Sequence, residues 1–445
     1  MDQPASSKPT NVRWVVFGLA CSTSWLLILH RYTFALIKDD VMRERNLTEG
    51  QIGLIDSGFA MFYTLFQFPL GVAADAVGVR LVLTALIVVW SIGLALHAWA
   101  PGKNELWLAR AVLGIGQSAV LASINRIARQ WFPAKIRTTL QGIVGITAGR
   151  VGGLSANLIF ATLLIGTFGL EWRTAIWIFA SLGFIQAVAF LVLFRNSPRE
   201  HPLVNAAESS LISGDTSGEV RADPVPQKIT IGQLLRGMTP AALVNFGALN
   251  VQTILSTFAD NIFSNWIPLF LARVHDLKFA EMGIYSALPL LGGAIGGAVG
   301  GMLNDSFIAR TGNRRWSRRG VGLAGKGLAA VLIFASLTVY NNPYAFCFAL
   351  FFVKFFSDWS LTTAWGTVTD IGGRATASVF AFNNAVAGIG SIGAPAILGY
   401  VAQHYGWPAV FVVTGATYAV CSLSWLLIDC TIPLVRDEPD EAAAI

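Results

Sequence analysis

The sequence predicts an all-α membrane protein with twelve transmembrane helices arranged as two six-helix halves. Three observations carry this prediction: 54% of the 445 residues are hydrophobic, only 13% are charged, and long apolar segments recur along the chain. A water-soluble domain normally carries about 25% charged residues, so this composition cannot cover a surface that faces water. Twelve spans of about 20 residues fit this length and leave the remainder for connections. A large soluble enzyme domain has no room here.

The apolar segments form two sets of six. A hydropathy window of about 19 residues places them near residues 14–37, 50–73, 80–100, 105–125, 138–165 and 172–194, and then 240–271, 281–304, 320–340, 343–366, 376–400 and 407–430. The stretch between the sets is rich in Ser, Pro, Gly and acidic residues and has too few apolar residues to fold alone. We therefore predict an N-terminal half over 1–195, a cytoplasmic linker over 196–237 and a C-terminal half over 238–445.

The positions of lysine and arginine predict the orientation of the chain. Most loop residues of these types fall on the side of the N-terminus, which the positive-inside rule makes cytoplasmic. Lys38, Arg43 and Arg45 are assigned to the first loop on the opposite side. An even number of spans then places both termini in the cytoplasm, and we expect a plasma or inner membrane. In that same loop, Asn46 begins an N-glycosylation motif that counts only in a glycosylating host.

Several functional classes find no support in the sequence. The net charge of +6 comes from residues scattered through loops, which does not indicate nucleic-acid binding. The four cysteines lie inside apolar segments without metal-ligand spacing, so neither a metal site nor a disulfide framework is expected. No phosphate-binding loop and no nucleophile paired with a base is recognised, so we expect neither an enzyme nor a cofactor. The first apolar segment continues into Arg31 without a cleavage site and is predicted to be a retained helix.

The two halves contain an internal repeat. Four residues recur 230 positions later: Leu47, Gly53, Gly71 and Asp75 match Leu277, Gly283, Gly301 and Asp305. A duplicated six-helix unit encloses a site between its copies, which rock against each other as a solute crosses. Asp75 belongs to the pattern G-x-x-x-D-x-x-G-x-R, which ends at Arg80 and is typical of a tight turn between helices. We predict a latch here that holds the halves closed on the cytoplasmic side.

These motifs resemble the major facilitator superfamily. The turn from Gly71 to Arg80 matches the superfamily's signature loop, and Arg110-x-x-x-Gly114-x-Gly116 resembles its fourth-helix element. The run from Gln117 to Pro133 resembles the anion:cation symporter branch, which includes carriers of hexuronates, aldonates and aromatic acids. The resemblance implies the major facilitator fold and alternating access, with Asp75, Arg80, Arg110 and Asp305 in the conformational latch.

Two positions depart from the branch pattern. The sequence has His30-Arg31 where the branch typically carries Asp-Arg, and Gln117 where it typically carries Glu. The acids at those positions are the branch's expected proton carriers. Proton symport is the default that the resemblance implies, while their loss favours uncoupled or sodium-coupled transport as alternatives.

Polar residues inside the apolar segments are the candidate substrate contacts. A charge near the bilayer centre is costly, so such a group normally faces the bundle interior. Arg31 is predicted to be the main anion contact, because its guanidinium offers a fork of donors to a carboxylate; the alternative is that it extends to the membrane interface. Tyr63 and Gln67 lie one turn apart and would share a helix face. Gln117 is expected to hydrogen-bond the substrate or a neighbouring helix, and Arg150 to be a second anion contact.

A second group of residues is predicted to couple or gate transport. His30 titrates near neutral pH and could carry a proton, although it could equally be a packing residue. Lys354 and Asp358 are four positions apart and should form an ion pair, either a gate or a structural pair. Asp260 is a candidate alternative partner, and the two aspartates together could hold a sodium ion. Asn384 is expected in the cavity wall by resemblance.

The sequence therefore predicts a secondary transporter of a small organic anion, such as a sugar acid, that acts as a monomer in the lipid bilayer. The co-transported ion is a proton or sodium, if there is one. Two alternatives are an efflux carrier of amphipathic compounds and a non-transporting sensor of the same fold. Efflux of amphipathic or cationic compounds predicts an acidic, aromatic pocket, and transport should then survive the replacement of Arg31 by alanine.

Overall fold

The computed structural model describes residues 8–213, 238–373 and 376–434. Within these residues, eleven helices are long and apolar enough to cross a membrane. The last of them, Ser378–Ser424, consists of two helices joined at Gly406, whose φ of 80° is not helical. The predicted all-α architecture of twelve spans is therefore confirmed. Residues 214–237 of the predicted linker and both chain ends lie outside the described residues.

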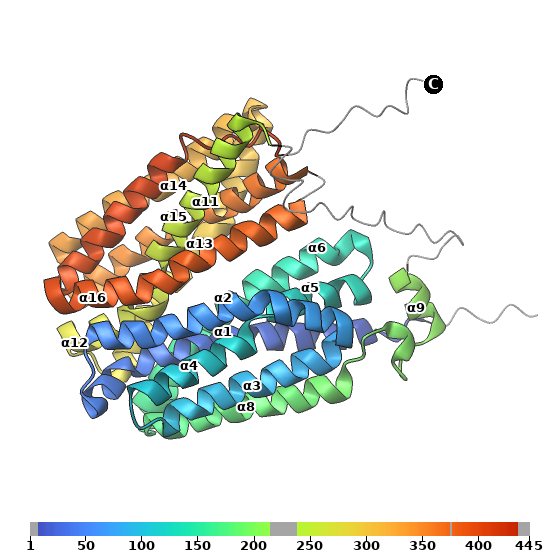
Figure 1. The fold of residues 1–445 in the computed structure, drawn as a ribbon, viewed down its shortest axis with the longest axis horizontal. Helices are drawn as coiled ribbons and strands as arrows, with labels where there is room; N and C mark the ends of the chain where they lie inside the picture. Colours follow the sequence, from blue (N-terminus) through green and yellow to red (C-terminus); the bar gives the residue numbers. More distant parts are fainter. Residues whose placement is uncertain (1–7, 214–237, 374–375, 435–445) are drawn as a thin grey trace, which may run out of the picture. The chain divides into compact units, whose positions relative to one another are not determined.

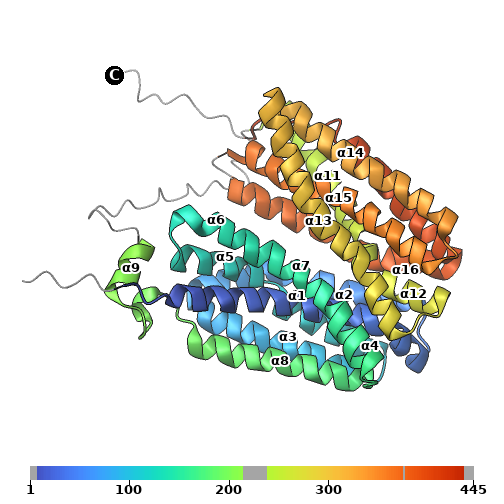
Figure 2. The ribbon, with the colours of Figure 1, turned by 180° about the vertical axis from the view of Figure 1, so that it is seen from behind.

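The helices of the N-terminal half run side by side (Figures 1 and 2). Their bounds are α1 (Val12–Arg45), α2 (Glu49–Val77), α3 (Val79–Trp99), α4 (Lys103–Gln117), α5 (Val120–Trp131), α6 (Ala134–Gly142), the π-helical η1 (Ile143–Ala148), α7 (Gly149–Ser155), the π-helical η2 (Ala156–Thr167) and α8 (Trp172–Leu193). The fourth span is α4 followed by α5, and the fifth, Gly149–Thr167, consists of α7 and η2 and is preceded by α6 and η1.

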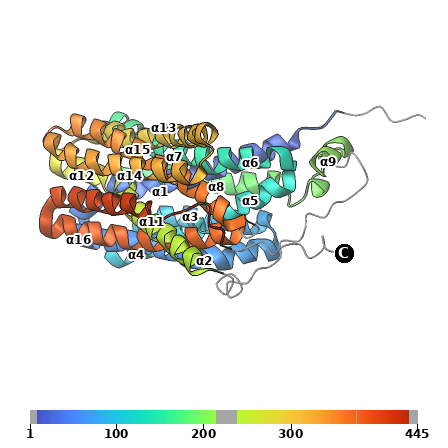
Figure 3. The same cartoon turned by 90° about the horizontal axis from the view of Figure 1, so that it is seen from above.

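Two short helices and the C-terminal half follow. Their bounds are η3 (Pro198–Glu200), α9 (Ala206–Ser213), α11 (Pro240–Asn265), α12 (Ile267–His275), α13 (Phe279–Thr311), α14 (Arg314–Ser336), η4 (Leu337–Val339), α15 (Pro343–Gly372) and α16 (Thr376–Ser424). Helices α14 and α15 lie against each other, as Figure 3 shows from above.

The described residues divide into two compact units. The first contains residues 8–213 together with Phe263–Leu290 and Pro395–His404, and the second contains the rest of the C-terminal half. Helices α11, α13 and α16 therefore each have one part in the first unit. These parts pack on the N-terminal half through hydrogen bonds such as Ser286 to Asn157, at 2.6 Å.

Glycines in α4 bring this helix close to its neighbours. A Cβ added at Gly114 would lie 2.4 Å from the carbonyl oxygen of Phe59 in α2, and one at Gly116 would lie 2.4 Å from the backbone nitrogen of Trp90 in α3. Only glycine permits such backbone approach. The packing buries Arg110 and Gln117, which lie on the same helix. The glycines of the R-x-x-x-G-x-G pattern thus allow the close packing that buries both side chains.

The assignment of Lys38 and its neighbours to a loop is wrong. Helix α1 continues to Arg45, and the Lys38 side chain is fully buried within it. The charge is tolerated because a carboxylate from α2 lies next to it, as described below. Helix α2 then begins with a capping box, in which the Thr48 hydroxyl accepts from the Gln51 amide at 3.3 Å.

Candidate functional site

Arg31 lies in the interior of the N-terminal half, next to an aromatic surface from α2. Its guanidinium carbon is 5.0 Å from the ring centre of Phe59 and 4.9 Å from that of Tyr63. Its Nε donates to Oε1 of Gln117 at 3.1 Å. Cation–π contacts and a fixed Nε orient the planar group. Arg31 is therefore held in a defined pose by α2 and α4.

Gln117 is hydrogen-bonded to protein groups through both its amide oxygen and its amide nitrogen. Besides accepting from Arg31, its Nε2 donates to the carbonyl oxygen of Leu27 at 2.9 Å, and the side chain is buried. Nη2 of Arg31, in contrast, is buried without a hydrogen-bond partner among the described residues. A buried donor in this state favours binding of an acceptor, and an anion is the best acceptor for a guanidinium.

The remaining predicted contacts take different positions. Tyr63 and Gln67 lie partly buried on α2, and Tyr63 also stacks on Phe59, with ring centres 5.8 Å apart. Arg150 is partly buried on α7. Asn384 is exposed on α16, whereas its neighbour Asn383 is buried and donates to Asn250 at 3.1 Å. The place of Asn384 in the cavity wall stays a prediction.

A buried charge cluster that the sequence analysis missed lies beside Arg31. Lys38 donates to Oδ2 of Asp56 at 2.7 Å, and Arg110 donates to Oδ1 of the same carboxylate. All three side chains are at most 2% exposed. The Arg110 guanidinium lies 4.6 Å from the Phe59 ring centre, so it shares this ring with Arg31. Asp56 is an isolated acid in the apolar segment 50–73, and this position was the signal in the sequence that pointed to a buried charge cluster.

His30 occupies a packing environment. Its ring is fully buried and lies 6.2 Å from that of Phe179 in α8. A Cβ added at Gly183 of α8 would lie 3.2 Å from the His30 ring, so the two helices touch here. Both ring nitrogens of His30 are buried without a hydrogen-bond partner among the described residues.

Three of the four predicted latch residues, Asp75, Arg80 and Arg110, make contacts within the N-terminal half. Asp75 at the end of α2 pairs with Arg126 of α5. The Arg80 side chain donates from Nε to the carbonyl oxygen of Leu191 at 2.9 Å, which ties α3 to α8. Asp305 is exposed on α13, and Arg110 belongs to the buried cluster with Asp56.

A second polar cluster lies in the C-terminal half. Lys354 donates to Oδ1 of Asp358 at 2.6 Å, the ion pair expected from their spacing, and lies 3.2 Å from Oδ1 of Asp260. Three further members were not expected from the sequence. They are Lys326, which lies 3.7 Å from Asp260, and the hydroxyl donors Ser357 and Tyr418, both bonded to Asp260.

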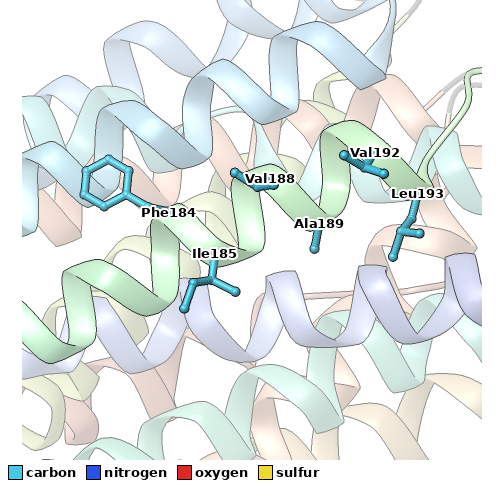
Figure 4. A pocket seen from close by; sticks show the side chains of 6 residues that line it. All are labelled: Phe184, Ile185, Val188, Ala189, Val192 and Leu193. Atoms are coloured by element: carbon cyan, nitrogen blue, oxygen red, sulfur yellow. The ribbon is translucent and has the colours of Figure 1, made fainter.

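An apolar groove lies on the surface of the N-terminal half. Figure 4 shows that it lies along α8, lined by Phe184, Ile185, Val188, Ala189, Val192 and Leu193. Its volume is about 560 Å³ and its lining side chains are all hydrocarbon. Such a surface suits contact with lipid rather than a charged solute.

A family model described as Major Facilitator Superfamily matches residues 20–311 and 249–444. The chain belongs to the Major Facilitator Superfamily. As a superfamily member it is a multi-pass membrane transporter and not an enzyme, as the sequence predicts.

Several similar proteins are named as transporters of organic acids. The chain is 26% identical over 443 residues to a probable sulfoacetate transporter of Cupriavidus necator, covering 97% of this chain and 96% of the relative. It is 25% identical to the D-galactonate transporter of Escherichia coli O6:H1, with coverages of 96% and 98%. The hexuronate transporter of Escherichia coli K12 is 24% identical, with coverages of 76% and 75%. The predicted resemblance to the anion:cation symporter branch is confirmed.

Solved structures share the fold. A bacterial homologue of the human lysosomal transporter Spinster, in an inward-facing and unoccupied conformation, aligns with a TM-score of 0.75 and 19% identity, covering 94% of this chain and 98% of that one. A D-xylose-proton symporter aligns with a TM-score of 0.71 and 15% identity, with the same coverages of 94% and 98%.

Proposed function

We propose that the protein transports a small organic anion by alternating access, with Arg31 as the main anion contact. The observation that supports this most directly is the state of the guanidinium. Gln117 holds its Nε at 3.1 Å, while Nη2 has no hydrogen-bond partner among the described residues. An unsatisfied buried donor costs about 1–3 kcal/mol, and a bound carboxylate or sulfonate would recover that cost. Because Gln117 is neutral, it leaves the positive charge of Arg31 available.

The polar groups around Arg31 favour a hydroxylated or otherwise polar acid. Tyr63 and Gln67 lie on one face of α2 and offer a hydroxyl and an amide to the neutral part of the cargo. Arg150 and Asn384 stay proposals for a second anion contact and the cavity wall. The similar carriers of sulfoacetate, galactonate and hexuronate support the same class of cargo.

The test is uptake into proteoliposomes, preceded by a thermal-shift screen of sugar acids, sulfonates and aromatic acids. A ligand that binds the folded state raises its melting temperature. Arg31→Ala should weaken binding of the best ligand about 10- to 150-fold, since a charge-assisted hydrogen bond contributes roughly 1.5–3 kcal/mol. Arg43→Ala is the control, because Arg43 is 60% exposed and pairs within its own helix. Undiminished transport by Arg31→Ala would instead favour efflux of amphipathic compounds.

Any ion coupling is proposed to lie in the C-terminal cluster and not at His30. A proton on His30 would add a buried charge to a ring whose nitrogens have no hydrogen-bond partner among the described residues, whereas the cluster around Asp260 already compensates charge. Lys354 bridges Asp260 and Asp358, at 3.2 and 2.6 Å, and so occupies the position that a sodium ion shared by the two carboxylates would need. This favours a proton over sodium as the coupled ion.

Asp260→Asn tests the coupling proposal. Substrate exchange across the membrane should persist, because exchange needs no net ion movement, while accumulation driven by a proton gradient should be lost. His30→Gln is the comparison and should retain accumulation. Loss of accumulation in His30→Gln alone would contradict the assignment.

We further propose that both termini are cytoplasmic, in a plasma or inner membrane, and that the protein works as a monomer with halves at 1–195 and 238–445. The basic residues of the loops support this orientation. Reporter domains fused to each terminus test it, because both should be active only on the cytoplasmic side.

A further inference from the structure

A buried lysine joins α1 to the break between α11 and α12. Nζ of Lys38 donates to the carbonyl oxygen of Asn265 at 2.8 Å, and it lies 4.6 Å from the ring centre of Trp266. Asn265 ends α11 and Ile267 begins α12, with Pro268 in the first turn of α12. The last carbonyls of a helix lack intrahelical donors, and Pro268 has no N–H with which to form an i→i+3 bond to the carbonyl of Asn265. The ammonium therefore satisfies a carbonyl that the helix break leaves open.

The counter-ion of Lys38 comes from its own half. Asp56 on α2 holds Nζ at 2.7 Å, and it also holds Arg110. If Asn265 moves away, Lys38 keeps its ion pair and loses one hydrogen bond to a neutral carbonyl together with one ring contact. Separation therefore leaves no buried charge uncompensated, and the contact can break and re-form reversibly.

We propose that Lys38 is a positioning residue for transport. Its contact with Asn265 forms a second latch, distinct from the one predicted around Asp75, that holds the α11–α12 break against α1 whenever the end of the transporter that contains this break is closed. Asp56 links this latch to the anion site, because Arg110 on the same carboxylate shares the Phe59 ring with Arg31. Other contacts, such as Thr162 to the carbonyl oxygen of Ala280 at 3.0 Å, close the same set of helix ends. The inference requires alternating access but does not depend on the identity of the cargo.

Spin labels test the latch without any substrate. Cysteines replacing the exposed Lys103 and Lys278 report the distance between the start of α4 and the start of α13 by pulsed electron resonance. Lys38→Met should raise the ratio of long to short distances at least about tenfold, the effect of losing one charge-assisted hydrogen bond. It leaves Asp56 paired with Arg110, so no charge is stranded. Lys38→Gln keeps a neutral donor and should lie between Lys38→Met and the unsubstituted protein.

Arg173→Met is the matched control, since Arg173 pairs with Glu44 and Glu171, both in the N-terminal half. Arg43 is unsuitable, because its partner Asp39 also pairs with Arg273 of α12. A distance distribution in Lys38→Met identical to that of Arg173→Met would overturn the proposal. If Lys38→Met does not fold, the same comparison is made with Lys38→Gln. Because no anion is added, failure here leaves the proposed function untouched.

A separate observation concerns a basic crevice where α5 and α6 meet the helix α9. It has a volume of about 310 Å³, and its lining includes Arg129, Arg137, Arg199, Ser197 and Ser209 but no carboxylate. Nη2 of Arg137 is held by the carbonyl oxygens of Arg129 and Phe132, at 3.1 and 3.2 Å, while its Nε is buried without a partner among the described residues. Three guanidinium groups and two hydroxyls are the donors that a phosphate group prefers.

We infer that this crevice binds a phosphate group, supplied by an anionic phospholipid headgroup or by a soluble phosphorylated compound. The first source fits the predicted cytoplasmic interface, where basic pockets meet acidic lipids. Native mass spectrometry with added phosphatidylglycerol or phosphatidylcholine tests the lipid, and a thermal-shift titration with inorganic phosphate tests the soluble source.

Arg137→Gln should reduce retention of phosphatidylglycerol, or the affinity for phosphate, about tenfold. Arg195→Gln is the control, because Arg195 lies nearby but donates to the carbonyl oxygens of Val192 and Phe194, outside the lining. A response to phosphatidylglycerol alone identifies the lipid as ligand, and a response to phosphate identifies the soluble source. Equal behaviour of the two variants with both probes would contradict the inference.

Discussion

Replacing Gln117 with glutamate is predicted to weaken anion binding sharply. The amide oxygen lies 3.1 Å from Nε of Arg31, so an ionised carboxylate there would form a direct ion pair. At an effective dielectric constant of about 20, two charges at that distance attract by about 5 kcal/mol. One cargo carboxylate gains roughly 1.5–3 kcal/mol from its charge-assisted hydrogen bond. The introduced carboxylate therefore outcompetes the cargo for the guanidinium, and Kd should rise about 10- to 150-fold.

Isothermal titration with the best ligand from the screen measures this change. Gln117→Leu is the comparison, because it removes both amide hydrogen bonds, to Arg31 and to Leu27, without adding a charge. Its Kd should rise less than that of Gln117→Glu, since only the positioning of Arg31 suffers. If Gln117→Glu binds as tightly as the unsubstituted protein, or more tightly than Gln117→Leu, the charge argument is wrong.

Three further predictions concern stability. In α13, Gly296→Ala would place a Cβ 2.0 Å from the carbonyl oxygen of Phe355. The melting temperature should therefore fall by the equivalent of about 1–3 kcal/mol. Gly301→Ala is the control, because its Cβ meets nothing within 4 Å and should not lower the melting temperature. Tyr418→Phe removes a hydrogen bond to Asp260 and should cost roughly 1.5–3 kcal/mol in denaturant unfolding; no change would show that the hydroxyl is dispensable. The Glu208 carboxylate caps α1 by accepting from the amides of residues 12 and 13, both at 3.0 Å. Burial alone would raise the pKa of Glu208, but the hydrogen bonds to its carboxylate outweigh burial and lower the pKa in the folded protein. The stabilisation by this carboxylate is therefore complete above about pH 4.5, and it is lost as the pH falls through the lower pKa of the folded state. Glu208→Gln should therefore cost about 1 kcal/mol at neutral pH and remove that acid dependence, and an unchanged pH profile of melting would contradict this.

Much of the fold could be predicted because lipid imposes a simple rule. A backbone in the bilayer must satisfy its own hydrogen bonds, so apolar segments of sufficient length become helices. The ends of those helices were harder to predict. The apolar signal of the first segment stops near residue 37, but α1 continues to Arg45, and Asp56 compensates the buried charge of Lys38 in this extension. A hydropathy window cannot detect a compensating charge that comes from another helix.

The same distinction applies to the candidate site, where contacts within one helix could be predicted and contacts between helices could not. The spacing of Lys354 and Asp358 sufficed to predict their ion pair, because residues four apart share a helix face. The partners of Asp260 come from three other points of the chain, and their proximity is a property of helix packing alone. The resemblance pointed to Arg31 and Gln117, but the hydrogen bond between them depends on how closely α4 approaches α1.

The open donor on Arg31 bears on how the protein should be handled in solution. Common buffers such as MES and HEPES are sulfonates, and citrate and glutamate are carboxylates, so each is a competitor for the same guanidinium. Purification in Tris with chloride avoids these acids, and a titration repeated in HEPES should give a weaker apparent affinity for the true ligand. The choice of buffer thus becomes a probe of the binding chemistry.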